Sequence, residues 1–384
     1  MKLALYVHDL RLEIGHSNSL IELVRHLPAE FLRHFSELEV VAYTCDDLEK
    51  LFPHFPGKKS FHRVPRFLIR PFLVKSLFYQ LYTFLRHRLS SAQALRIGIG
   101  VSCLDVDAVS VQFIHHQWTT PGLAQERPGL RKLYKRLLFW YYERCEDFLF
   151  RRRGVRVFSP AKFLSDFLAL RYPGLEQRTI YSGVNLARFS PPKTSRTDIL
   201  ADLGARYPEL AALDPARPIA LFVGAYERKG LDRAIELVGQ QPGLQFVVIG
   251  RPSFAKTPHF PRGMSIVRVG FTREVERFYA LADVFVFPTL YEPFGLVLFE
   301  AMATGLVIVT RREQVGASEL LAELPEVYFC DRADFVMPSI SCRGIDARQA
   351  LTAKRLSMLA GVSWQESGRA LADFLAPLTR KISP

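Results

Sequence analysis

The sequence has few of the features that mark secreted, metal-binding or membrane-spanning proteins. Its five cysteines lack the paired spacing of a zinc site or a small disulfide framework. No apolar run approaches the roughly 20 residues that a membrane-spanning helix needs. The first segment, Met1–Asp9, is too short for a signal peptide and is typical of a buried strand. These absences favour a cytoplasmic protein with reduced thiols.

Acidic residues are missing from Gly57–Leu104, which holds nine lysines and arginines. A second stretch, Arg127–Arg156, has ten basic residues and three acids. Their combined charge of +16 exceeds the +13 of the whole chain, so the remaining residues sum to −3. Large apolar residues interleave with the cations in both stretches, as in segments that bind anionic membranes. A nucleic-acid groove has a similar composition, and the aromatic residues alone are explained by a packed core with solvated cations.

The length of 384 residues favours two domains rather than one core. Strand-like apolar runs alternate with helix-like segments, which predicts parallel sheets covered by helices. The predicted strands are Met1–His8, Leu38–Thr44, Leu95–Val101, Ala108–His115, Val155–Ser159, Ile219–Val223, Gln245–Ile249, Ser265–Val269, Val284–Pro288 and Leu306–Thr310.

A Pro-rich polar break at Ser190–Ser195 predicts the interdomain linker. We therefore expect an α/β protein with two Rossmann-like, doubly wound domains. Residues 1–189, completed by a helix at about 363–384, form the first domain, and residues 190–362 form the second. Ligands of such sheets bind outside the carboxyl ends of the strands, so two facing domains share one central cleft.

The most informative segment is Phe285–Gly305, where a buried strand, a short polar loop and an apolar helix follow one another. Glu292 lies in the loop, Gly295 opens the helix, and Glu300 follows about one turn later. A helix start offers unpaired N–H groups to a phosphate, and a carboxylate on each side suits hydroxyl groups. The pattern indicates a nucleotide-sugar site, and an ordinary loop with two solvated acids is the alternative.

Three further elements accompany this segment. Leu221–Asp232 combines a strand, a glycine turn at Gly224, the cations Arg228 and Lys229, and a helix start. The other two are the turn Gly183–Phe189 and the strand end Val269–Phe271.

In order and spacing these four elements resemble the GT4 family of retaining glycosyltransferases, which have the GT-B fold. The family pattern of two glutamates separated by seven residues, with Pro-Phe-Gly after the first, stands intact from Glu292 to Glu300. The string Phe222–Glu236 and the long basic, aromatic insertion before Val155–Ser159 look like those of lipopolysaccharide-core glucosyltransferases.

The resemblance implies a role for each matching residue. Arg228 and Lys229 would neutralise the departing diphosphate, Glu292 would bind the donor sugar, and Glu300 would bind the ribose hydroxyls. His116 would act at the donor sugar, although the neighbouring His115 is an equal candidate, and both are predicted to end a strand. The remaining residues implied in donor binding are Gly15, Gly224, Phe271, Phe294, Gly295, Leu296 and Val297.

The first domain departs from the family at two places. His16 follows Gly15 where a second glycine is expected, which places its ring beside the phosphates or the acceptor. Asp105-Val106-Asp107 spells the metal-binding motif of a different transferase class, but a polar turn before a strand explains it better. We therefore expect transfer without a bound metal or other cofactor.

Together these patterns predict a retaining, metal-independent hexosyltransferase. Its donor would be a nucleotide-diphosphate sugar, with UDP as the expected nucleotide, and its acceptor a membrane-associated glycolipid or polysaccharide such as a lipopolysaccharide core. The expected location is cytoplasmic, peripheral on the inner face of the membrane, with an anionic membrane surface as partner and no nucleic acid. A soluble acceptor is one alternative, and a non-catalytic nucleic-acid-binding protein is another.

Overall fold

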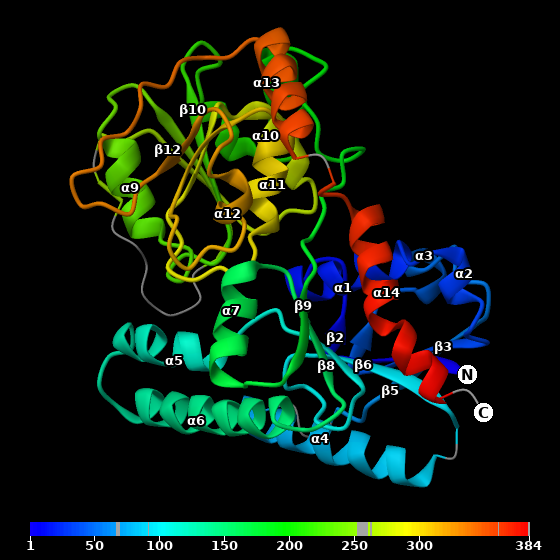
Figure 1. Ribbon diagram of the computed structural model, residues 1–384. Helices are drawn as coiled ribbons and strands as arrows, with labels where there is room; N and C mark the ends of the chain where they lie inside the picture. The colour runs from blue at the N-terminus through cyan, green and yellow to red at the C-terminus, as the bar shows by residue number, and fades with distance from the viewer. Residues whose placement is uncertain (67–69, 91, 252–259, 262, 360, 383–384) are drawn as a thin grey trace. The chain divides into compact units, whose positions relative to one another are not determined.

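The computed structural model describes residues 1–66, 70–90, 92–251, 260–261, 263–359 and 361–382. Its chain forms two compact units, coloured along the chain in Figure 1. Unit 1 contains Met1–Ser182 and the C-terminal segment from Ser363, and unit 2 contains Gly183–Val362. The first boundary thus precedes the turn Gly183–Phe189, whereas the sequence predicted it after this turn.

Unit 1 is built on a seven-stranded parallel sheet. The strand order is β5-β3-β1-β6-β7-β8-β9. A small parallel ladder, β2 with β4, continues beyond β1 and β3. The strands are β1 (Lys2–Tyr6), β2 (Asp9–Leu10), β3 (Glu37–Ala42), β4 (Thr44–Cys45), β5 (Lys58–Arg63), β6 (Ala94–Ile99), β7 (Ala108–Ser110), β8 (Arg156–Ser159) and β9 (Glu176–Thr179).

Helices connect these parallel strands, as the crossover geometry of a parallel sheet requires. In Figure 1, α4 and α6 run along the lower side of unit 1, and α1 and α14 lie above its strands. The helices of unit 1 are α1 (Gly15–Arg25), α2 (Ala29–Leu32), α3 (Leu48–Leu51), α4 (Phe72–Leu89), α5 (His115–Ala124), α6 (Leu130–Phe150), α7 (Lys162–Arg171) and α14 (Trp364–Ile382).

The C-terminal helix α14 is an integral part of unit 1. The Ser367 hydroxyl donates to the Tyr181 carbonyl at 2.6 Å. A side chain at Gly368 could not fit, because its Cβ would lie 2.0 Å from the carbonyl oxygen of His26 at the end of α1. Glycine therefore allows α14 to cross α1 at backbone contact.

Unit 2 is a second doubly wound domain, on a six-stranded parallel sheet with the order β12-β11-β10-β13-β14-β15. Its strands are β10 (Ile219–Val223), β11 (Gln245–Ile249), β12 (Ile266–Val269), β13 (Val284–Phe287), β14 (Val307–Thr310) and β15 (Val327–Phe329). Its helices are α8 (Arg196–Gly204), the 3-10 helix η1 (Pro208–Ala212), α9 (Leu231–Gly239), α10 (Val275–Leu281), α11 (Leu296–Ala303), α12 (Ser318–Leu321) and α13 (Ile345–Met358).

The alternation of side chains along the strands explains how helices cover both faces of this sheet. Phe222 and Val286 pack into one cluster with Leu231 and Ile235 of α9. Phe285, one residue from Val286, instead faces Tyr279 of α10, with ring centres 5.4 Å apart. Because both faces are buried, the central strands are apolar throughout, which is why the sequence revealed them.

Every predicted strand overlaps a strand of the structure, and most of the omissions have a common cause. The sequence missed the two-residue strand β2, and it missed β5, β9 and β15, which lie at the edges of the two large sheets. Edge strands are partly solvated, and β5, with the sequence Lys-Lys-Ser-Phe-His-Arg, carries no apolar run. One predicted strand, Ala108–His115, is too long, since β7 ends at Ser110.

Candidate functional site

The turn after β10 carries the predicted phosphate-binding cations. Gly224 follows the strand with a φ of +135°, a backbone conformation that favours glycine. A Cβ at this position would lie 3.0 Å from Cγ of Lys229, so the glycine also leaves room for the lysine stem. The turn closes through a hydrogen bond from the Lys229 N–H to the Ala225 carbonyl at 3.1 Å, and α9 begins at Leu231.

Lys229 is mostly buried, although a turn at a helix start is normally exposed to solvent. Its side chain is 11% exposed and forms an ion pair with Glu292, itself 13% exposed. The Lys229 ammonium also lies 4.8 Å from the centre of the Phe287 ring. Burial and the neighbouring charge of Arg228 lower the pKa of Lys229 well below its ordinary value.

Arg228 joins the same group from the rim of the turn. Its Nη1 lies 3.7 Å from Oε2 of Glu292 and donates a hydrogen bond to the Tyr291 carbonyl at 3.1 Å. The Arg228 carbonyl in turn accepts from the Leu290 N–H at 3.1 Å. Burial lowers the pKa of Arg228. The structure thus brings Arg228, Lys229 and Glu292, from two turns, into one charged cluster.

The loop that holds Glu292 is fixed by its backbone. The Glu292 N–H donates to Gln314 at 2.8 Å, and the Gly316 N–H donates to Glu292 at 2.9 Å, so that Glu292 forms a parallel bridge with Val315. Because hydrogen bonds hold the Glu292 backbone on both sides, this loop keeps the carboxylate close to Arg228 and Lys229.

The helix start that follows has the predicted form. Gly295 is the N-cap of α11, with a left-handed backbone, and Leu296 and Val297 begin the helix. The first N–H groups of a helix lack intrahelical partners, so they are available to an anion. Phe294 is buried and packs on Phe299, with ring centres 5.1 Å apart, and therefore anchors the turn from inside.

Glu300 lies in the second turn of α11 and is partly buried. Burial raises the pKa of Glu300 to about 7, although a hydrogen bond from Tyr279 and the charge of Arg188 oppose this rise. The sequence did not single out Tyr279, which comes from α10 and is fully buried. Arg188 belongs to the turn Gly183–Phe189 and pairs with Glu276 at 2.7 Å. That turn therefore brings a positive charge toward Glu300.

Two predicted donor residues lie apart from this cluster. Phe271 follows β12, is 51% exposed, and lies 5.9 Å from the guanidinium carbon of Arg251. Gly15 belongs to unit 1, where it is the first residue of α1 rather than part of a loop, and His16 follows it in the first turn. A Cβ at Gly15 would meet no atom within 4 Å, so local packing does not require a glycine there.

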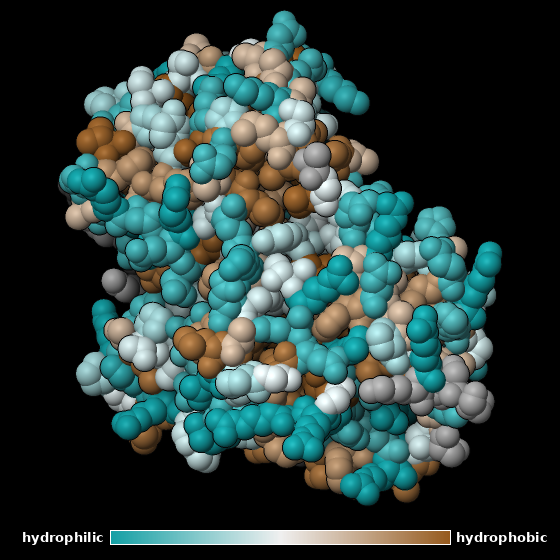
Figure 2. Space-filling view, viewed as in Figure 1, coloured by the Kyte–Doolittle hydropathy of each residue, from teal (hydrophilic) through white to brown (hydrophobic). Residues whose placement is uncertain are grey.

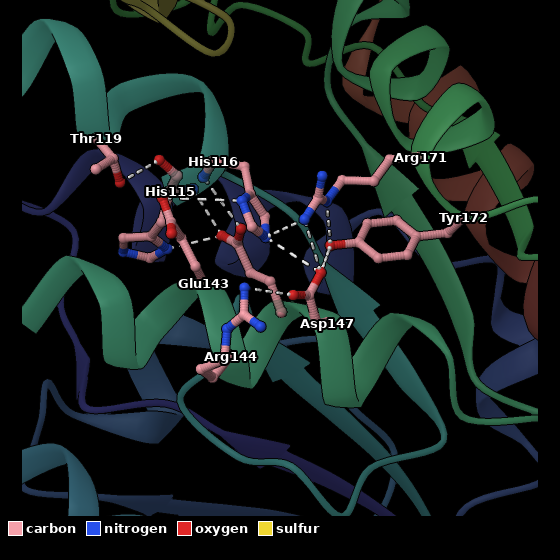
Figure 3. Close-up of polar contacts among 9 residues, drawn as sticks. His115, His116, Thr119, Glu143, Arg144, Asp147, Arg171 and Tyr172 are labelled. Atoms are coloured by element: carbon pink, nitrogen blue, oxygen red, sulfur yellow. Dashed lines mark hydrogen bonds and ion pairs between the residues drawn. The ribbon is translucent and has the colours of Figure 1, made fainter.

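The candidate histidines His115 and His116 begin helix α5, whereas the sequence predicted that they end a strand (Figure 3). The cause is a carboxylate from α6. Glu146 accepts hydrogen bonds from the His115 N–H at 2.6 Å and the His116 N–H at 3.3 Å, and so caps α5. The His115 ring is held by the same carboxylate at 2.7 Å and stacks on Tyr142.

The ring of His116 belongs to a polar network. Its Nε2 lies 3.2 Å from Oδ1 of Asp147 and 3.1 Å from Nη2 of Arg171. Arg144 and Tyr172 also contact Asp147, at 3.1 Å and 2.9 Å (Figure 3). The network fixes the orientation of His116, which is what a sugar-contacting imidazole needs and also what a purely structural one needs.

The Asp-x-Asp motif of unit 1 has structural partners. Asp105 contacts His87 at 2.9 Å and Arg152 at 3.3 Å, and Asp107 accepts the Arg96 N–H at 2.8 Å. Within the described ranges, no three histidine, cysteine, aspartate or glutamate side chains are grouped to hold a metal ion. The interpretation of this motif as a polar turn agrees with these contacts.

Residues 217–337 match the family model "Glycosyl transferases group 1". The lipopolysaccharide core biosynthesis mannosyltransferase LpsB of Rhizobium meliloti (strain 1021) is 33% identical over 172 residues, which cover 39% of this chain and 44% of that protein. The chain thus spans less than half the length of the curated relatives it matches first, which include a spore coat protein at 49%.

Solved structures extend the likeness to the whole chain. The crystal structure of WaaG, a glycosyltransferase involved in lipopolysaccharide biosynthesis, superposes with a TM-score of 0.64 at 16% identity and covers 99% of both chains. Anabaena Alr3699/HepE in complex with UDP-glucose gives a TM-score of 0.55 at 14% identity, covering 100% of this chain and 98% of that one. At these identities the likeness establishes the fold. Residues 217–337 thus match the group 1 (GT4) glycosyltransferases, and the chain has the GT-B fold.

Proposed function

We propose that this protein transfers a hexose, with retention of anomeric configuration, from a nucleotide-diphosphate sugar to a membrane-associated glycolipid or polysaccharide. The observation that carries the proposal is the cluster of Arg228, Lys229 and Glu292 in unit 2. Two cations and a carboxylate, partly buried in the same unit as the start of α11, match the charges of a sugar diphosphate.

In this proposal the ion pair is exchanged when the donor binds. The diphosphate engages Arg228, Lys229 and the N–H groups of Leu296 and Val297, and Glu292 is then free to accept the sugar hydroxyls. Glu300 accepts the ribose hydroxyls through its carboxylate. Phe271 contributes an exposed ring to the nucleotide, and Gly15 and His116 serve the donor from unit 1.

The proposed chemistry needs no bound metal. The bond between the anomeric carbon and the diphosphate oxygen breaks, and the acceptor oxygen attacks the same face of the sugar. The acceptor proton passes to the departing phosphate oxygen. Arg228 and Lys229 stabilise the negative charge that develops there, which is where preorganised electrostatics contribute most.

The comparisons support a UDP-linked donor and a lipopolysaccharide-type acceptor. A structural neighbour was solved with UDP-glucose, and LpsB and WaaG are named for lipopolysaccharide synthesis. We therefore propose a UDP-hexose as donor and a lipid-linked core saccharide as acceptor.

The surface of unit 1 supports a membrane-associated acceptor and a peripheral location at the inner membrane face. On α6, Leu130, Leu133, Leu137 and Trp140 recur at helical spacing and are exposed, and cations such as Lys132 and Arg136 lie between them. On α4, Leu77, Leu81, Phe84 and Leu85 are exposed in the same way.

Figure 2 shows the resulting mixture of brown and teal along the lower side of unit 1. Such a surface suits anionic lipid, since apolar groups enter the interface while cations meet the headgroups. No helix within the described ranges is long and apolar enough to cross a bilayer.

The proposal is tested by ligand-induced stabilisation followed by a transfer assay. Each of several nucleotide sugars is added to the purified chain, and the true donor raises Tm because it binds only the folded state. That donor should then transfer its sugar to a lipid-linked saccharide with retention, as read by the anomeric proton signals of the product. If no nucleotide sugar changes Tm, or if the product has inverted configuration, the proposal is wrong.

A further inference from the structure

A pocket in unit 1 has not been assigned so far. Its volume is about 770 Å³, within the range of small-ligand sites. It lies where the ladder of β2 with β4 extends β1 and β3, beside the first turn of α4. Asp9 and Thr44 come from that ladder, which follows the carboxyl ends of two parallel strands. In doubly wound sheets this is the edge at which ligands bind.

The pocket has an excess of positive charge. Arg66, Arg70 and Lys75 line it, against the single carboxylate of Asp9. Lys75 and Asp9 neutralise each other, because the ammonium lies 3.0 Å from Oδ2 of the carboxylate. Asp9 is held further by the Thr44 hydroxyl at 2.6 Å, and its pKa is lowered by these contacts, although burial opposes them. Arg66 and Arg70 therefore supply the net positive charge of the pocket.

The guanidinium groups are placed to meet a ligand. Nε of Arg66 donates to the Tyr43 carbonyl at 3.3 Å, which ties one edge of that guanidinium to the end of β3. Arg66 and Arg70 are both exposed to solvent at the pocket. A guanidinium presents several N–H donors in one plane, and this geometry matches a phosphate better than an ammonium does.

Aromatic rings form the other wall. Tyr43, Phe72 and Tyr134 line the pocket. The Tyr134 hydroxyl accepts the Leu73 N–H at 3.0 Å, so it satisfies the start of α4 and holds α6 against it. Phe72 is 47% exposed and therefore presents ring surface that the core does not use. Flat rings beside polar groups suit a sugar, which has apolar C–H faces and polar edges.

A partly buried histidine, His8, lies behind this wall and stays neutral. The His8 ring packs against Tyr43 and Phe72, with centroid distances of 6.0 Å to each. Burial and the charge of Lys75 lower the pKa of His8 to about 3, so it adds no charge.

We propose that this pocket binds a phosphorylated saccharide, with its phosphate on Arg66 and Arg70 and its sugar ring against the exposed ring of Phe72. The inference rests on the proposed function, since the saccharide is part of the acceptor, and it adds the chemical class of that acceptor. The same group occurs on a free sugar phosphate and on a phosphorylated lipid headgroup, so the test includes both sources.

The experiment measures binding of three small probes by titration calorimetry: glucose 6-phosphate, glucose and inorganic phosphate. Glucose 6-phosphate should bind more tightly than either of the others. Arg66→Gln combined with Arg70→Gln should weaken its binding roughly tenfold or more, since charge-assisted hydrogen bonds are lost. Phe72→Ala should weaken the binding of glucose 6-phosphate but leave the binding of inorganic phosphate unchanged. Arg88→Gln, on the exposed end of the same helix, is the matched control and should change nothing.

A second arm compares vesicles that contain phosphatidylinositol with vesicles that contain phosphatidylglycerol at equal charge. Preference for phosphatidylinositol that disappears in the double arginine variant identifies a lipid headgroup as the source. Equal binding to the two vesicle types, with glucose 6-phosphate still bound, identifies a free sugar phosphate.

The inference is overturned if glucose and glucose 6-phosphate bind equally, or if the double variant binds glucose 6-phosphate like the wild type. Stabilisation by the nucleotide sugar is measured on the same samples. If that stabilisation persists while glucose 6-phosphate does not bind, only the pocket assignment fails. If the nucleotide sugar does not bind the wild type, the proposed function fails independently.

Discussion

The ammonium of Lys229 lies against the carboxylate of Glu292, and the two residues come from turns that follow different strands, β10 and β13. The pair is mostly shielded from solvent and rests on the Phe287 ring. Each charge therefore depends on the other for compensation as long as no ligand is bound.

Removing one member of this pair should cost stability as well as activity. Lys229→Met keeps the length of the side chain but leaves the Glu292 carboxylate without its main partner. Loss of one partner of a buried pair typically costs about 3–5 kcal/mol. We expect a decrease of this order in the free energy of unfolding, measured by urea denaturation.

The matched double variant separates the two effects. Lys229→Met with Glu292→Gln removes both charges, so it should recover most of the lost stability while remaining inactive in transfer. Additive losses in the double variant would show that the two side chains are not coupled.

Arg228 is predicted to act mainly on the chemical step. Arg228→Ala should lower kcat by about 10²–10³-fold, as expected for a lost electrostatic contact to the developing charge. Arg228→Lys should retain part of the activity because it keeps the charge. Arg233→Ala is the control, since Arg233 pairs with Glu236 on the surface of α9. A near-normal kcat for Arg228→Ala would remove Arg228 from the site.

The raised pKa of Glu300 predicts pH-dependent donor binding. If the carboxylate form accepts the ribose hydroxyls, a nucleotide sugar should bind roughly tenfold more tightly at pH 8 than at pH 6, since the pKa of the free site is about 7. Glu300→Gln should bind weakly and without this dependence. A pH-independent Kd in the wild type would contradict the role of Glu300.

Glu300 should have the opposite effect on folding stability, which should fall as pH rises. The folded-state pKa of about 7 exceeds the ordinary value of 4.5. Between these values the folded protein binds more protons than the unfolded chain, so the contribution of Glu300 to stability falls as pH rises through this window. The Tm of Glu300→Gln relative to the wild type should therefore be higher at pH 8 than at pH 5, as scanning calorimetry can show.

Membrane binding can be followed through Trp140. This residue is 56% exposed on α6, whereas Trp118 and Trp364 are buried. Vesicles with anionic lipid should shift the tryptophan emission to the blue, and neutral vesicles should not. Lys132→Gln with Arg136→Gln should weaken binding by roughly 1 kcal/mol per cation. Trp140→Phe should abolish the shift, and Lys162→Gln on α7 serves as control. Equal binding to both vesicle types would count against an anionic surface.

Transfer activity should persist in excess chelator. The motif Asp105-Val106-Asp107 is occupied by contacts within unit 1, as its hydrogen bond to the Arg96 N–H illustrates. Loss of activity in EDTA with recovery on adding Mn²⁺ would contradict this prediction.

The buried strands and the helix start at Gly295 could be predicted from the sequence because their signals are local. Central strands are apolar on both faces, and the turn at Gly295 needs a particular residue type. The edge strand β5 could not be predicted from the sequence, since solvent on one side of an edge strand allows a polar sequence.

The side-chain partners of the site were beyond the reach of sequence patterns. Lys229 is buried only because the loop around Glu292 folds over it, and α5 starts at His115 only because Glu146 of α6 caps it. Tyr279 meets Glu300 for the same kind of reason. Each contact joins segments that are distant along the chain, so no local spacing encodes it.

Because α14 belongs to unit 1, the two units are completed at different times during synthesis. Unit 2 is one continuous segment, and all of it has left the ribosome before α14 emerges. Unit 1 is incomplete until α14 is made, because the backbones of α14 and α1 cross in contact at Gly368 and His26. The nascent chain therefore carries a self-contained second domain while the first still lacks a piece, and a premature stop before Ser363 would damage the domain that was translated first.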